Sequence, residues 1–169
     1  MSALKNFLAV FCFTMLAGPA FADDTKSDAD LFGARLSVLD ISLSPDGTKV
    51  ALIAPGGKSE EVVYVIDIQA GGQPKAVLRN SDPLGELLWC KWATNSRIVC
   101  QLRLVERSQA QLLGFSRLIA VDDDGANAGI LMQRTGSNTI GFAQDGGSVI
   151  AWGVEGEDDT ILMTRQFLK

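Results

Sequence analysis

Cys90 and Cys100 are the residues whose type and spacing point most directly to covalent chemistry. The chain has no histidine and three cysteines, of which Cys12 lies in an apolar run that we interpret below as part of a signal peptide. A structural zinc site needs four ligands, and two cysteines without a histidine do not supply them. The pair therefore indicates either a disulfide or two reduced core cysteines. The choice depends on whether the strands that carry the two cysteines place them opposite each other.

No catalytic group can be assembled around the other polar residues. The absence of histidine excludes Ser-His-Asp and Cys-His chemistry. Ser116 starts a predicted strand and lacks the second glycine of a G-x-S-x-G turn. The run Asp122–Asn127 resembles the start of a calcium loop without its full spacing, and Glu155–Asp159 is interpreted as an exposed acidic loop. We predict no catalytic residue, no cofactor and no metal, and therefore no enzyme activity in this chain alone.

The segment Ile41–Ile53 is the element around which the rest of the chain is organised. Apolar and polar residues alternate on both sides of a turn formed by Pro45, Asp46 and Gly47, as expected for two strands buried on one face. These turn residues predict a type I turn followed by a glycine bulge. That register would pair Ser44 with Thr48.

The same pattern returns twice along the chain. The second copy spans Cys90–Cys100 with Asn95 in its turn, and the third spans Ile140–Ala151 with Asp145 and Gly146 in its turn. The apolar residue before each turn is Leu43, Trp92 or Phe142, which gives spacings of 49 and then 50 residues. Repeats of this length are typical of propellers and solenoids.

Two further strand-like runs lie between successive hairpins, so each unit is expected to hold four short antiparallel strands. This predicts an all-β fold, a partial β-propeller with two complete four-stranded antiparallel blades and an incomplete third. The blades are expected at about 37–84, 85–135 and 136–169. Because a propeller needs roughly four to eight blades to close, we expect the chain to require further blades or partner copies.

The hairpin register also bears on the cysteines. If the second turn has three residues, Trp92 lies opposite Ile98 and Cys90 lies opposite Cys100. Facing cysteines on antiparallel strands are close enough to be joined. We therefore predict a Cys90–Cys100 disulfide, with two reduced core cysteines as the alternative.

Residues 1–22 have the pattern of a secretory signal peptide. Lys5 precedes a short apolar run, and Ala20-Phe21-Ala22 forms a cleavage site before an acidic start. Residues 23–36 are expected to form an N-terminal arm. The mature chain is predicted to be exported to the periplasm or beyond the cell, where disulfides persist, and to have no membrane association after signal cleavage. The net charge of −5 and the lack of a basic patch argue against a nucleic-acid partner.

Several blocks in order resemble the first propeller blades of bacterial exported serine peptidases of the prolyl oligopeptidase family. They are Leu31–Arg35, Ser37–Pro55, Tyr64–Ile68 and Leu88–Trp92. The likeness is closest to the dipeptidyl- or acylaminoacyl-peptidase-like branch. The resemblance implies a non-catalytic propeller that admits short peptides to a C-terminal α/β-hydrolase domain, which carries the catalytic residues and is missing here.

The expected partners are therefore that missing hydrolase domain or further blades, together with peptides or a periplasmic protein. Glu60 and Glu61 lack the neighbours of the family's substrate-binding glutamate pair, so that role is not transferred to them. Two alternatives stay open. One is a TolB-like periplasmic propeller module for protein–protein interaction, since such modules share the Ser-Pro-Asp-Gly hairpin. The other is a small β-protein that oligomerises to complete its ring.

Overall fold

The structure is a computed structural model, and it describes residues 33–34, 36–108, 111–132, 144–154 and 157–164. All of its strands lie in one compact unit, Arg35–Lys169. The predicted signal peptide lies outside the described residues. Of the predicted arm, only Gly33, Ala34 and Leu36 lie inside them.

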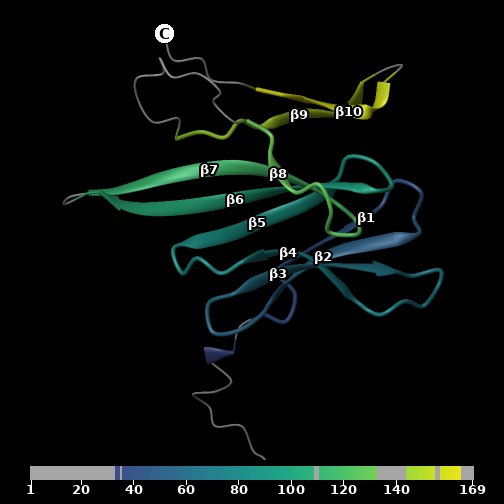
Figure 1. Ribbon diagram of the computed structural model, residues 1–169, viewed down its shortest axis with the longest axis horizontal. Helices are drawn as coiled ribbons and strands as arrows, with labels where there is room; N and C mark the ends of the chain where they lie inside the picture. The colour runs from purple at the N-terminus through teal and green to yellow at the C-terminus, as the bar shows by residue number, and fades with distance from the viewer. Residues whose placement is uncertain (1–32, 35, 109–110, 133–143, 155–156, 165–169) are drawn as a thin grey trace, which may run out of the picture. The chain divides into compact units, whose positions relative to one another are not determined.

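The described strands form three antiparallel sheets (Figure 1). The first sheet has the order β1 (Asp40–Leu43), β2 (Lys49–Pro55), β3 (Glu61–Asp67) and β4 (Lys75–Asn80). The second has the order β5 (Gly85–Trp92), β6 (Arg97–Ser108), β7 (Gln111–Asp122) and β8 (Gly129–Ile130). β9 (Val149–Val154) pairs with β10 (Glu157–Met163). The prediction of an all-β chain built from antiparallel sheets is confirmed, and the described strands do not close into a ring.

The main core lies between the first two sheets. The first sheet contributes apolar residues from β2, β3 and β4, and the second contributes residues from β5, β6 and β7. The alternation of the strands explains this, because residues two apart on a strand face the same side. The core is formed by Ala51, Ile53, Val63, Val65, Val77, Leu87, Cys90, Trp92, Ile98, Cys100 and Val121.

A second, smaller core covers the other face of the β5–β8 sheet. Val99, Leu118 and Ala120 are buried there, and residues of the β9–β10 pair pack against them. The β5–β8 sheet is therefore covered on one face by the sheet that precedes it in the chain and on the other by the pair that follows.

The predicted register of the first turn is wrong by one residue. Leu43 lies opposite Val50, and the Ser44 amide donates to the Lys49 carbonyl. The loop has four residues because Thr48 folds into it and donates both its amide and its hydroxyl to Asp46. The other turn features are confirmed, since the Gly47 amide donates to the Ser44 carbonyl at 2.9 Å and Gly47 has a φ of 72°.

Two further predicted boundaries need correction. β6 and β7 have 12 residues each and extend as a hairpin past the start of β5 (Figure 1), whereas the predicted strand covered only Ser116–Val121 in this region. The acidic run predicted as a loop is partly a strand, because β10 begins at Glu157. The first strand of the third predicted hairpin, residues 140–143, lies outside the described residues.

No helix in the described part of the chain is both long and apolar enough to cross a lipid bilayer.

Candidate functional site

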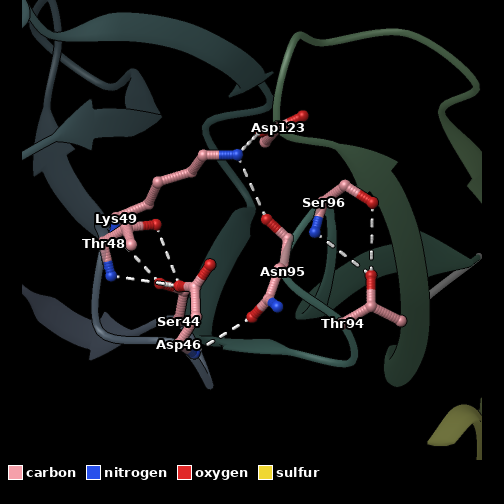
Figure 2. Close-up of polar contacts among 8 residues, drawn as sticks. All are labelled: Ser44, Asp46, Thr48, Lys49, Thr94, Asn95, Ser96 and Asp123. Atoms are coloured by element: carbon pink, nitrogen blue, oxygen red, sulfur yellow. Dashed lines mark hydrogen bonds and ion pairs between the residues drawn. The ribbon is translucent and has the colours of Figure 1, made fainter. Parts of the chain in front are cut away.

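A set of polar residues joins the loops at one end of the first two sheets, and we call it the turn cluster (Figure 2). It brings together the β1–β2 turn, the β5–β6 turn and the start of the β7–β8 loop. The cluster consists of Ser44, Asp46, Thr48, Lys49, Thr94, Asn95, Ser96 and Asp123.

Asp46 organises the first turn from within. Its Oδ1 accepts hydrogen bonds from the Ser44 hydroxyl at 2.7 Å, the Thr48 amide at 3.0 Å and the Thr48 hydroxyl at 2.9 Å. Such contacts are typical of aspartate in tight turns. They favour the charged carboxylate, so the pKa of Asp46 lies below its ordinary value of 3.8, with the Ser44 hydroxyl as the main cause.

Contacts between the sheets pass through Asn95 and Lys49. The Asn95 Oδ1 accepts from the Asp46 amide at 3.0 Å, and the Asn95 carbonyl accepts from the Lys49 Nζ at 3.2 Å. The same Nζ donates to Asp123 Oδ2 at 2.5 Å (Figure 2). One lysine of the first sheet is thus bound to two loops of the second.

The electrostatics of the turn cluster oppose acid–base catalysis. The hydrogen bond to Asp123 raises the pKa of Lys49 above its ordinary value of 10.5, so its ammonium stays charged at neutral pH. A protonated amine is neither a base nor a nucleophile. With Asp46 held as a carboxylate, the cluster offers fixed charges and hydrogen bonds rather than a group that transfers protons.

The acidic run Asp122–Asp124, at the end of β7, forms hydrogen bonds with other protein groups. Asp122 accepts from Arg97 and, at 2.6 Å, from Asn127 Nδ2, and these contacts lower its pKa, Asn127 having the larger effect. Asp124 accepts from the Ala126 amide at 2.8 Å. Among the described residues, no group of three or more acidic, cysteine or histidine side chains is arranged to hold a metal ion.

The third turn lies against β7, away from the turn cluster. The Ser116 hydroxyl donates to Asp145 Oδ1 at 3.2 Å and accepts from the Gly146 amide at 3.0 Å. A Cβ atom at Gly146 would lie 2.5 Å from the Ser116 carbonyl oxygen, so glycine is required for this approach. Ser116 therefore fixes a turn, in which the Asp145 carboxylate accepts its hydroxyl hydrogen and the Gly146 amide donates to its oxygen.

The predicted cysteine pair lies in the core between the sheets. Cys90 is directly opposite Cys100 on β5 and β6, and Trp92 is opposite Ile98, so the predicted register of this hairpin is confirmed. The two sulfur atoms are joined in a disulfide, with the Cα atoms 4.1 Å apart. The Cys90 amide, on the far side of β5 from β6, donates to Asp40 Oδ2 of β1 at 2.8 Å.

A second hydrogen bond joins the edge strands β1 and β5. The indole Nε1 of Trp92 donates to the Ser42 carbonyl at 3.2 Å. At the other end of the sheets, the buried Glu61 carboxylate accepts from the Leu87 amide at 2.6 Å. Buried polar groups that cross an interface in this way fix the alignment of its two sides.

A pocket of about 460 Å³ opens near Glu61, between the β2–β3 loop and the start of β5. Its charged residues are paired with protein groups: Glu61 with the Leu87 amide, and Glu86 with Arg103. Its lining is Lys58, Ser59, Glu61, Pro83, Leu84, Gly85, Glu86, Arg103 and Val105.

The predicted turn residues are thus divided between two places. The β1–β2 and β5–β6 turns, which contact each other, hold Pro45, Asp46, Gly47 and Asn95. The third turn holds Asp145 and Gly146 and packs against Ser116 of β7. Sequence reasoning missed several residues that bridge the sheets, which are Asp40, Ser42, Lys49, Glu61 and Asp123. A signal for some of them was present, since hydrogen bonds between the sheets join residues 49 or 50 positions apart, which is one repeat.

No protein-family model, no curated protein and no solved structure matches this chain.

Proposed function

We propose that the chain is the propeller portion of an exported serine peptidase that resembles the prolyl oligopeptidase family, and that it limits access of peptides to a separate hydrolase domain. The observation that carries this proposal is the serial packing of the sheets. The β5–β8 sheet has one face on the preceding sheet and the other on the following pair, as successive blades of a propeller would.

The chemistry of the described residues is consistent with a gating rather than a catalytic role. The Lys49 ammonium is held by Asp123 between the sheets, Asn95 accepts from the Asp46 amide, and the Cys90–Cys100 pair is oxidised. A rigid connection between blades is what a gate needs, because an opening of fixed size selects its substrates by size. Export also suits the disulfide, which would persist in an oxidising compartment.

The test is to read the genomic DNA beyond the Lys169 codon. We expect a continuing or frameshifted frame that encodes more repeats near fifty residues and then G-x-S-x-G with later Asp and His. Further repeats without a hydrolase domain would favour the TolB-like interaction module instead. A region with neither would contradict the proposal.

An activity assay supplies a second test. The purified chain is expected not to hydrolyse aminoacyl or dipeptidyl chromogenic substrates, because the triad would belong to the proposed hydrolase domain. Peptidase activity that co-purifies with the protein to homogeneity would contradict the proposal that the chain is non-catalytic.

A further inference from the structure

The Cys90–Cys100 disulfide is closed off from solvent. Cys90 and Cys100 are 1% and 0% exposed, and both lie in the core between the first two sheets. Reduction of a disulfide begins when a thiolate attacks one of its sulfur atoms, so its rate depends on access to that atom. A reductant therefore reaches this bond only when part of the core opens.

β1 is the strand of the first sheet that is held most weakly beside this core. It is an edge strand of four residues, with β2 as its neighbour in the sheet. None of the four residues is buried, whereas Ala51 and Ile53 of β2 are 1% and 0% exposed. Segments with few buried apolar groups detach locally at a lower free-energy cost than global unfolding. The core can thus open at β1 while the rest of the first sheet stays folded.

Two hydrogen bonds join β1 to the strand that carries Cys90. The Cys90 amide donates to Asp40 Oδ2 at 2.8 Å, and the Trp92 indole Nε1 donates to the Ser42 carbonyl at 3.2 Å. The bond to Asp40 is the stronger kind, because its acceptor is a carboxylate. It is made at the cysteine itself, so it must break before β1 can move away from Cys90.

A buried hydroxyl at the same junction opposes this attachment. The Ser42 Oγ is buried and has no hydrogen-bond partner among the described residues. A buried polar group without a partner costs free energy, and detachment of β1 would return this hydroxyl to water. Asp40 therefore favours the closed position of β1, whereas the Ser42 hydroxyl favours the open one.

We propose that β1 is a latch over the disulfide. The bond is closed to reductants while β1 lies on β5, and it is reduced when β1 detaches locally, without unfolding of the whole chain. With dithiothreitol, one thiolate attacks a cysteine sulfur and releases the other cysteine as a thiolate. The second thiol of the reagent, as its thiolate, then closes the cyclic disulfide of oxidised dithiothreitol and frees the first cysteine, so two electrons pass to the protein. The inference does not depend on the proposed function.

The experiment measures how fast dithiothreitol reduces the native protein without denaturant. The full chain is expressed in an exporting host, and free Cys90 and Cys100 are trapped with iodoacetamide and counted by peptide mass. Asp40→Ala removes the carboxylate acceptor, Asp40→Asn keeps an acceptor oxygen, and Ser42→Ala removes the unpaired hydroxyl. Gly146→Ala is the matched control, because its new Cβ would disturb the third turn against β7 and not the contact of β1 with β5. Urea unfolding gives the global stability of each variant.

The reduction rate should rise about tenfold or more in Asp40→Ala, rise less in Asp40→Asn and fall in Ser42→Ala. Gly146→Ala should be reduced at the wild-type rate although its free energy of unfolding is lower. Rates that follow the global stability of all the variants would overturn the proposal, because reduction would then require unfolding of the whole chain. A native wild type that is reduced as fast as the urea-unfolded chain would overturn it as well.

Far-ultraviolet circular dichroism checks that the variants fold. If Asp40→Ala does not fold, the opposite effects of Asp40→Asn and Ser42→Ala carry the test, and equal rates in these two variants would contradict the latch. None of these outcomes bears on the DNA test of the proposed function.

Discussion

At the scale of single residues, the polar groups of the turn cluster hold neighbouring loops together. Asp46, Asn95, Lys49 and Asp123 are each bound to a neighbouring loop. Their side chains are at most partly buried, so no single contact contributes much free energy. Their combined effect is geometric, since they fix how the turns of consecutive sheets meet.

The Asp46 carboxylate should make the stability depend on pH in the acid range. Its folded pKa lies below the unfolded value near 3.8, so its contribution is present above that value and is lost as the pH falls through the folded pKa. Asp46→Asn keeps an acceptor oxygen and removes the charge. We expect the wild type to be more stable than this variant at pH 6 and the difference to shrink toward pH 3 in urea unfolding experiments. A difference that is constant or grows on acidification would contradict this assignment.

The disulfide should contribute measurably to stability. Joining Cys90 to Cys100 closes a short loop, for which the loop-entropy estimate is about 2–3 kcal/mol. We expect the double variant Cys90→Ala/Cys100→Ala to lose at least that much free energy of unfolding in guanidinium, because removal of two buried sulfur atoms also leaves small cavities. Dithiothreitol should lower the stability of the wild type and leave the double variant unchanged. Equal stability of the two proteins without reductant would show that the bond has no such effect.

At the scale of elements, the local patterns predicted a large part of the fold. The Leu43 and Trp92 hairpins, the strands between them and the Cys90–Cys100 register follow from alternation and turn residues. The first turn was mispredicted because the Thr48 side chain adds a residue to the loop, an effect that backbone turn preferences do not contain.

The long β6–β7 hairpin was missed for a different reason. Charged residues such as Arg103 and Glu106 interrupt its apolar residues, although Leu102 and Leu104 do alternate with polar neighbours. Pairing over the full length of two strands supplies backbone hydrogen bonds that a single-strand pattern does not reveal. Pairing with a neighbouring strand also explains β10, where Glu157–Asp159 lies in a strand although the charges suggested a loop.

The attachment of the third turn to β7 should depend on Gly146. In Gly146→Ala the new Cβ would meet backbone atoms of Ser116 and Arg117 at 2.5–2.6 Å, and backbone cannot move aside as a flexible side chain can. We expect the free energy of unfolding to fall by about 1–3 kcal/mol. The loss should appear as faster amide hydrogen exchange in β9. Gly129→Ala is the control, because no atom lies within 4 Å of its Cβ position. Equal exchange in the two variants would argue against this close approach.

At the scale of the whole molecule, the three sheets pack one on the next in the order in which they occur in the chain. This could be expected from the repeat period, because residues one period apart become neighbours when equivalent units stack. The residues that bridge the sheets could not be found in the same way. Lys49 and Asp123 are 74 positions apart, so their contact depends on the stacking itself.

The most direct test uses two of the three indole groups in a nitrogen-15-edited NOE spectrum of the oxidised protein. The Trp92 indole proton should show NOEs to the backbone around Ser42, because its Nε1 donates to that carbonyl. The Trp89 indole proton should show NOEs to the Gln101 side chain of its own sheet, which makes it the internal control. If the Trp89 signal behaves as expected and Trp92 shows contacts only with β5–β8, the serial packing of the first two sheets is wrong.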